Sequence, residues 1–257
     1  GRTSFQHVGA TMLLCASEKT ATSVALVLGA TAAAAVAWQV YLRRSTRPLK
    51  GPLQCQQCEP PLTASTAVLR RLLEVIEKEI LPKTTEQVAA GNKVFGAAVL
   101  DGAFDTVVAD TNHETSCPLY HGEVYTIKQW SSVANKPSAA SSIFLSTHEP
   151  CCMCISAIVW SGFRKCYYFF PYETTRNQGI PHDLKIMHQL WGVERYVTRN
   201  EFCATAGILE LIESLPSGPD KDELQATARR INAKYNDLSH KYHSEKGHNA
   251  KNTLAFN

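Results

Sequence analysis

Four residues of the sequence could form a catalytic metal site. His121 and Glu123 lie in a His-x-Glu pattern, and Cys151 and Cys154 follow thirty residues later. One imidazole and two thiolates are soft or borderline ligands of Zn²⁺, and three protein ligands leave the fourth tetrahedral position for water. A structural zinc site would be closed, so this set indicates a catalytic site. We therefore predict Zn²⁺ as a cofactor bound by His121, Cys151 and Cys154.

Glu123 is the candidate acid–base group of this site. Zinc can lower the pKa of bound water to about 7, which makes hydroxide available to attack a ring carbon that carries an exocyclic amine. The reaction also needs a proton carried from the water to the ring and then to the leaving ammonia. Glu123 lies two residues from His121 and is not itself a ligand. We predict it as the catalytic proton shuttle of a hydrolytic deaminase.

Helices must position both halves of this motif. Cys151 follows a proline, and proline and thiolates are both favoured in the first turn of a helix, where backbone N–H groups are unpaired. Residues three apart lie on one helical face, so Cys151 and Cys154 can hold one ion, while Cys152 is interpreted as a buried bystander. We expect helices to start near His121 and to cover residues 151–160.

Strands alternate with helices along the rest of the core. Apolar residues at helical spacing predict a helix over 68–80. Apolar runs bounded by turn residues predict four strands, at 94–100, 106–109, 143–146 and 166–170. Further helices are expected over 182–190 and 202–215. This alternation predicts an α/β protein built as a three-layer α/β/α sandwich on a mixed sheet.

An apolar segment lies near the start of the sequence. Within residues 1–47, the stretch 21–42 has no charged residue and is long enough to cross a bilayer. Because Arg43, Arg44 and Arg47 follow it directly, a membrane anchor would leave the catalytic part in the cytosol. The alternatives are a targeting sequence whose removal leaves the protein in an organelle or the cytoplasm, and a disordered alanine-rich leader.

Composition divides the rest of the 257-residue chain into three regions. Residues 48–63 contain four prolines and little apolar periodicity, as expected of a linker. Within this linker, Cys55 and Cys58 could be half of a metal site or a redox pair. The catalytic domain is predicted at 64–215. Residues 216–257 form a polar extension that is expected to be partly helical or disordered.

Further motifs surround the metal-site residues. They are Phe95-Gly96-Ala97-Ala98-Val99, His121-Gly122-Glu123, and Glu149-Pro150-Cys151 with Met153-Cys154. Because of these motifs, residues 94–198 resemble the cytidine and deoxycytidylate deaminase superfamily, in particular its cytosine, guanine and transfer-RNA adenosine deaminases. The resemblance implies a mixed five-stranded sheet, a zinc cofactor and a homodimer. It also implies that Asn112 contacts the substrate; the alternative is a turn asparagine that caps its own backbone.

Two downstream segments depart from these relatives. The aromatic run 167–170 is interpreted as a core strand and not as a platform for base stacking. His182 could line the pocket, whereas Asp183 is interpreted as a helix cap. Such loops set substrate specificity, so the motifs do not identify the substrate.

Charge favours a small substrate. The predicted catalytic domain carries thirteen Lys and Arg against sixteen Asp and Glu, without a clustered basic stripe. Nucleic-acid binding relies on Lys and Arg that neutralise phosphates, so nucleic acid is a less favoured partner than a small-molecule base or nucleoside. Two alternatives stay open: adenosine-to-inosine editing of transfer RNA, and a catalytically silent zinc-binding domain that serves as an interaction module.

Overall fold

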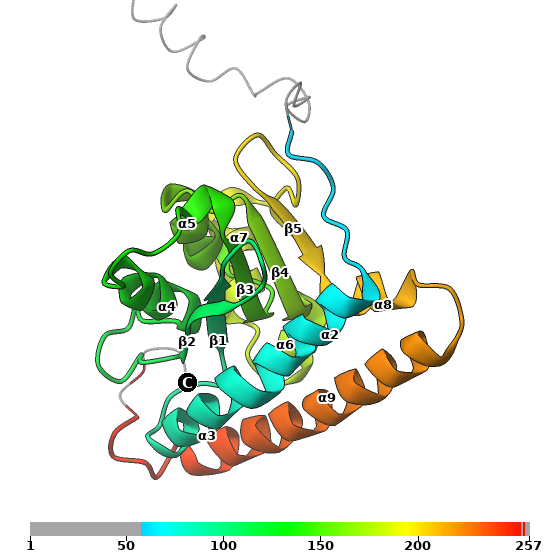
Figure 1. The fold of residues 1–257 in the computed structure, drawn as a ribbon. Coiled ribbons are helices and arrows are strands. Elements are labelled where there is room, and N and C mark those ends of the chain that lie inside the picture. The colour runs from blue at the N-terminus through cyan, green and yellow to red at the C-terminus, as the bar shows by residue number, and fades with distance from the viewer. Residues whose placement is uncertain (1–57, 253, 255–257) are drawn as a thin grey trace, which may run out of the picture. The chain divides into compact units, whose positions relative to one another are not determined.

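Strands and helices alternate through the computed structural model, which describes residues 58–252 and residue 254 (Figure 1). The strands are β1 (Gly96–Leu100), β2 (Thr106–Thr111), β3 (Ile143–His148), β4 (Lys165–Phe170) and β5 (Ala204–Gly207). The helices before β3 are α2 (Thr66–Val75), the π-helical turn η1 (Ile76–Ile80), α3 (Leu81–Ala89), α4 (Gly122–Ser131) and the 3-10 turn η2 (Ala139–Ser141). Those after β3 are α5 (Cys152–Trp160), α6 (Tyr172–Asn177), α7 (His182–Trp191), α8 (Ile208–Glu213) and α9 (Pro219–Glu245).

The strands form one mixed five-stranded sheet in the order β2-β1-β3-β4-β5. Strand β1 pairs antiparallel with both β2 and β3, whereas β3, β4 and β5 are parallel to one another. Because β2 and β3 both run opposite to β1, their carboxyl ends lie at the same edge of the sheet. The chain continues from these two ends toward α4 and α5. The predicted mixed five-stranded sheet is confirmed.

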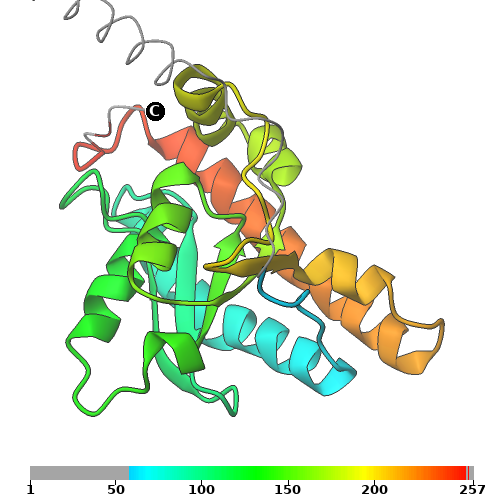
Figure 2. The same cartoon turned by 90° about the horizontal axis from the view of Figure 1, so that it is seen from above.

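Helices cover both faces of the sheet. Ala98 and Leu100 of β1 pack in a core cluster with residues of α2, α3, α8 and α9. Their neighbours Ala97 and Val99 point to the opposite face and pack with residues of α4 and α5. Successive side chains of a strand alternate between faces, so β1 is buried on both sides. The three layers predicted from the sequence are present (Figure 1, Figure 2).

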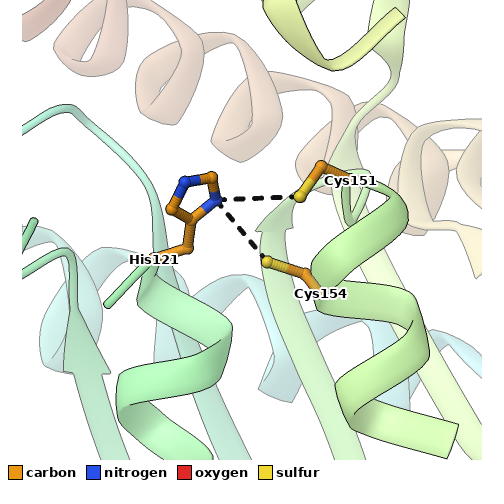
Figure 3. A group of neighbouring side chains, drawn as sticks. All are labelled: His121, Cys151 and Cys154. Carbon is orange, nitrogen blue, oxygen red and sulfur yellow. Dashed lines mark hydrogen bonds between the residues drawn. The ribbon is translucent and has the colours of Figure 1, made fainter. Parts of the chain in front are cut away.

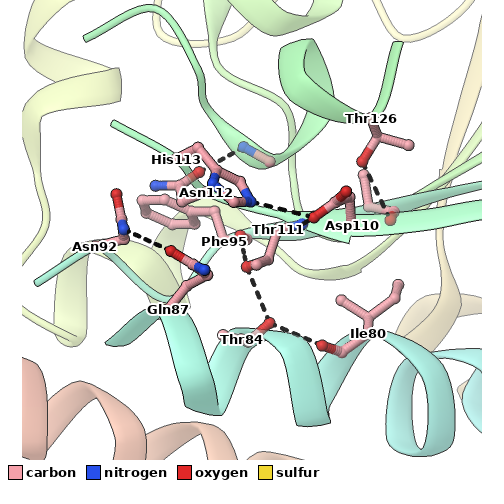
Figure 4. A network of polar contacts seen from close by, with 12 residues as sticks. Ile80, Thr84, Gln87, Asn92, Phe95, Asp110, Thr111, Asn112, His113 and Thr126 are labelled. Atoms are coloured by element: carbon pink, nitrogen blue, oxygen red, sulfur yellow. Dashed lines mark hydrogen bonds and ion pairs between the residues drawn. The ribbon is translucent and has the colours of Figure 1, made fainter. Parts of the chain in front are cut away.

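Buried hydroxyl groups connect the first helical run to the sheet. Thr84 Oγ1 of α3 lies 3.1 Å from Thr111 Oγ1 at the end of β2 (Figure 4). Thr111 Oγ1 in turn donates to the Phe95 carbonyl at 2.7 Å. Both threonines are fully buried, where an unpaired hydroxyl would be costly. These bonds therefore fix the beginning of β1 against α3.

The helix predicted over 202–215 is wrong in its first half. Residues Ala204–Gly207 form β5, which pairs with Lys165–Tyr168 of β4, and only Ile208–Glu213 are helical. Ala204 and Ala206 are tolerated in a strand because edge pairing with the buried strand β4 outweighs the weak strand preference of alanine. The misassigned segment is the fifth strand of the sheet.

The C-terminal extension, predicted to be partly helical or disordered, contains one long helix. Helix α9 runs from Pro219 to Glu245 and packs against α2, α3 and α8. Its buried residues recur every three or four positions: Leu224, Ala228, Ile231, Tyr235, Leu238, Ser239 and Tyr242. On its exposed side, Arg230 and Lys234 form ion pairs with Glu77 of η1. The apolar stripe explains the order, because it buries a continuous helical face against the core.

The features predicted for the N-terminal part lie outside the described residues. These are the apolar segment 21–42 and the cysteine pair of the proline-rich linker, whose first member, Cys55, is not described. Among residues 58–252 and 254, no helix is both long and apolar enough to cross a membrane.

Candidate metal centre

Two helix starts bring the predicted ligands together. His121 is the N-cap of α4, and Cys151 is the N-cap of α5, with Cys154 in the first turn of the same helix. Both helices follow strands that end at the same edge of the sheet, and α4 packs against α5. Figure 3 shows the three side chains pointing toward one another. The motif halves, thirty residues apart in sequence, therefore form one cluster.

The spacing of the ligand atoms fits a tetrahedral zinc ion. His121 Nδ1 lies 3.7 Å from Cys151 Sγ and 3.6 Å from Cys154 Sγ (Figure 3). With Zn–N of about 2.05 Å and Zn–S of about 2.3 Å, tetrahedral geometry separates nitrogen and sulfur by about 3.6 Å. All three ligand atoms lie within 4.8 Å of one another. The residues thus fit the predicted zinc cofactor, with one coordination position left for a further ligand.

Burial favours the protonated form of the Cys154 thiol. It raises the pKa of the Cys154 thiol well above its usual range, because the uncharged form is favoured away from water. Zinc binds thiolates and must therefore displace these protons. The metal is accordingly expected to bind more weakly as the pH falls.

Glu123 is held beside the ligands. It lies in the first turn of α4 and is 3% exposed. Ser146 of β3 donates to Glu123 Oε1 at 2.9 Å, and Glu123 Oε2 lies 3.2 Å from Cys154 Sγ. The carboxyl group is therefore oriented by the sheet and placed next to the metal-binding atoms without belonging to the ligand cluster.

Gly122, between His121 and Glu123, is required by close packing. A Cβ atom at this position would lie 2.7 Å from Gly96 Cα and 2.8 Å from the Phe95 carbonyl oxygen. Real Cβ atoms do not approach backbone atoms so closely. The first turn of α4 therefore rests directly on β1, which fixes both the ligand and the acid at the sheet edge.

A cavity of about 490 Å³ opens beside the ligands. His121 and Cys151 line it together with two further polar pairs, Lys93 with Glu114 and His182 with Asp183. The other walls are largely apolar and include Phe95, Leu119, Met153, Ile186, Leu190 and Trp191. A mostly apolar cavity with a few convergent polar groups is typical of a small-molecule site.

The cavity contains residues whose role the sequence analysis missed. His182 lines it, as considered from the sequence, but Asp183 lines it too and is not a helix cap, because the N-cap of α7 is Pro181 and no side chain caps this helix. Burial raises the pKa of Asp183 to about 6. Lys93 and Glu114 had no distinguishing spacing in the sequence. All four belong to segments that only the fold brings to the metal site.

The aromatic run and Asn112 lie away from the cavity surface. Tyr167 to Phe170 lie in β4 and are buried, as predicted for a core strand. Tyr172, just beyond, is buried and donates its hydroxyl to the Pro150 carbonyl. Asn112 is 0% exposed, and both polar atoms of its side chain have protein partners. Its contact with a substrate stays a prediction.

The central part of the chain matches a known family. Residues 73–170 match the sequence model described as the cytidine and deoxycytidylate deaminase zinc-binding region. This region belongs to the cytidine and deoxycytidylate deaminase family. The ligand cluster and Glu123 both lie within the matched deaminase region. No curated protein matches the sequence.

Solved structures of deaminases are similar to the chain. A guanine deaminase from Nitrosomonas europaea is 18% identical, covering 74% of this chain and 97% of its own, with a TM-score of 0.38. A guanine deaminase from Bacillus subtilis is 21% identical, covering 48% and 83%, with a TM-score of 0.39. A structure from work on A-to-I editing by tRNA:A34 deaminases is 15% identical, covering 58% and 97%, with a TM-score of 0.35. Similarity at this level does not identify a substrate.

A buried histidine next to the zinc-binding loop is expected to make the deaminase region sensitive to acid. Burial lowers the pKa of His148 to about 3, against about 6.5 in an unfolded chain. Between these values the unfolded chain binds more protons than the folded one. The contribution of neutral His148 is therefore complete above pH 6.5 and is lost as the pH falls toward 3.

We expect the free energy of unfolding to fall by about 2 kcal/mol between pH 7 and pH 5 on account of His148. Denaturant unfolding of the metal-free protein at both pH values measures this loss. His148→Gln should be less stable at pH 7 but should show a smaller decrease on acidification. Equal decreases in both proteins would mean that His148 is not the responsible group.

Proposed function

We propose that the protein is a zinc-dependent hydrolytic deaminase that replaces an exocyclic amine of a nucleobase or nucleoside by a carbonyl and releases ammonia. The observation that carries this proposal is the ligand cluster of His121, Cys151 and Cys154, at tetrahedral spacing, with Glu123 beside it and a cavity open to it. The family match of residues 73–170 supports the same chemistry.

Each residue of the cluster has a part in this reaction. The three ligands would hold zinc, which when bound activates water and polarises the reacting centre. Ser146 donates to Glu123 Oε1, while Oε2 faces the ligand cluster at Cys154 Sγ, so we assign to Oε2 the uptake of a proton and its delivery to the ring and the leaving amine. Burial of Glu123 excludes bulk water from this transfer.

Asp183 supplies a second carboxyl group in the cavity. It lies on the first turn of α7 and lines the same space as His121. Its pKa, raised by burial to about 6, lets it exchange between a hydrogen-bond donor and an acceptor near neutral pH. We propose that Asp183 orients the substrate ring by contacting the N–H groups at the edge of that ring.

The charges of the cavity favour a substrate without phosphate. Among the described residues that line it, Lys93 is the one lysine or arginine, and its Nζ is paired with Glu114 Oε1 at 3.0 Å. Two carboxyl groups, those of Glu114 and Asp183, face the same space. A phosphate would need free cations and would be repelled here. A free base or nucleoside therefore fits better than a nucleotide or RNA.

Ammonia release from a panel of substrates tests the proposal. The zinc-loaded protein is incubated with cytosine, guanine, adenine, their nucleosides and nucleoside 5′-monophosphates, and with an adenosine-containing anticodon stem-loop at low and moderate salt. We expect release from one base or nucleoside and at least about tenfold less from its monophosphate. Release confined to the stem-loop, decreasing steeply with salt, would establish RNA editing instead. No release from any substrate would contradict the deaminase proposal.

A further inference from the structure

The second ring nitrogen of His121 is directed to a buried carboxylate. While Nδ1 faces the two thiols, Nε2 lies 3.5 Å from Glu114 Oε1. Glu114 is 5% exposed and comes from the loop between β2 and α4. In most metal sites a ligand histidine directs its other nitrogen to a carboxylate, carbonyl or water, which fixes the tautomer and the ring orientation. Glu114 is placed to do this for His121.

Glu114 is itself held by partners on both oxygens. Lys93 Nζ donates to Oε1 at 3.0 Å, and the Lys93 side chain is only 8% exposed. Asn112 Nδ2 donates to Oε2 of the same carboxylate. Asn112, seen in Figure 4 at the end of β2, also accepts the backbone N–H of Gly122 through Oδ1. The carboxylate therefore has a defined position relative to the first residue of α4.

A buried Lys93–Glu114 pair is hard to explain by stability alone. Removing two charges from water costs several kcal/mol per ion, and well-packed apolar residues of the same volume often stabilise a fold as much or more. An apolar side chain could not offer a carboxylate oxygen to His121 Nε2. The location of the pair, next to a metal ligand and at the cavity wall, indicates a role at the metal centre.

We propose that Glu114 is a positioning residue, which fixes the ring of His121 with Nδ1 toward the metal, and that Lys93 and Asn112 hold Glu114 in place. The inference rests on the metal centre of the proposed function. It gives Asn112 a role other than contact with the substrate, in keeping with its full burial and its two side-chain hydrogen bonds.

Zinc affinity of Glu114→Gln, measured by competition with a chromophoric chelator, tests this proposal. Glutamine keeps the size of the side chain and removes its charge, and we expect zinc to bind about 10–100-fold more weakly. Glu77→Gln is the matched control. It also removes ion pairs of a carboxylate, those with Arg230 and Lys234, but these lie between η1 and α9. Its zinc affinity should equal that of the wild type. An affinity within about twofold of wild type in Glu114→Gln would overturn the proposal.

Further measurements separate positioning from folding. Thermal unfolding of the metal-free proteins should show a larger loss for Glu114→Gln than for Glu77→Gln, because Lys93 is left buried without its partner, so zinc affinity is compared on samples shown to be folded. The visible absorption of the cobalt-loaded protein should change only in Glu114→Gln. If the glutamine variant does not fold, Glu114→Asp keeps the charge and withdraws it by one methylene. We expect it to bind zinc more weakly than the wild type; unchanged affinity would refute the role of Glu114.

Because zinc affinity is measured without substrate, the two proposals fail separately. Weakened zinc binding in Glu114→Gln without ammonia release by the wild type would support the positioning role and refute the deaminase function. Ammonia release by the wild type with unchanged zinc affinity in Glu114→Gln would support the function and refute the positioning role.

Discussion

Replacing Glu123 by glutamine is expected to leave zinc bound and to reduce turnover by about 10²–10⁴-fold, the usual contribution of a positioned acid–base group. Glutamine retains the size of the side chain and can still accept the Ser146 hydroxyl through its amide oxygen, in place of Oε1. It cannot take up and return a proton at the atom beside Cys154. The change therefore removes the proton transfer and leaves the ligand cluster intact.

The measurements for Glu123→Gln are the rate of ammonia release at saturating substrate and the zinc content of the same sample. Glu77→Gln serves again as the control, since it removes a carboxylate paired on the exposed side of α9 and should retain full turnover. Near-normal turnover in Glu123→Gln would exclude Glu123 as the proton shuttle. Loss of zinc from this variant would instead assign Glu123 to the ligand set.

The candidate ligands could be predicted from the sequence because their chemistry is local. Cys151 and Cys154 belong to one helical turn, and the proline before Cys151 marks where that turn begins. His121 likewise stands at the start of a helix. Only the distance between the two helix starts could not be read from the sequence. That distance follows from two strands that end at the same edge of the sheet. The regular α/β arrangement thus brings His121 close to the two cysteines.

The rest of the candidate site depended on tertiary structure. Lys93 precedes β1, Glu114 lies in a loop after β2, and Asp183 lies on α7. No spacing in the sequence relates these charges to His121, because their proximity results from the packing of separate segments. Asp183 also has the residue type of a helix cap, so its local sequence favours that interpretation over a place in the cavity wall. Side-chain partners in a buried polar network are not encoded in any single stretch of sequence.

The wrong first half of the helix predicted over 202–215 and the length of α9 have different origins. Residues 204–207 form a strand only because β4 offers a pairing edge, and a short Ala-Thr-Ala-Gly segment has no strand pattern of its own. Helix α9, by contrast, carries a readable stripe from Leu224 through Ile231 to Leu238. Its many charged residues favour the disordered alternative for the extension, whereas this stripe favours the helical one. Periodicity was the better indicator there.

Removal of a thiolate ligand should abolish zinc binding and destabilise the protein. In Cys154→Ala two ligands remain, and the loss of affinity should exceed the roughly 10–100-fold that changes outside the ligand set cause. Bound zinc stabilises the folded state by mass action, by about 4 kcal/mol when free zinc is a thousandfold above the dissociation constant. Without its site the variant forgoes this stabilisation, in addition to the packing of a fully buried side chain.

Metal analysis and thermal unfolding, each with and without a chelator, measure the two effects of Cys154→Ala. The chelator should lower the unfolding temperature of the wild type and leave that of the variant unchanged. Cys166→Ala is the matched control: Cys166 is also a free, fully buried thiol, but it packs in the core between α4, α5 and the sheet. It should lose stability through the cavity alone and keep both its zinc and its response to the chelator. A full zinc complement in Cys154→Ala would remove Cys154 from the site, and the same test applied to Cys151→Ala decides whether both thiolates are needed.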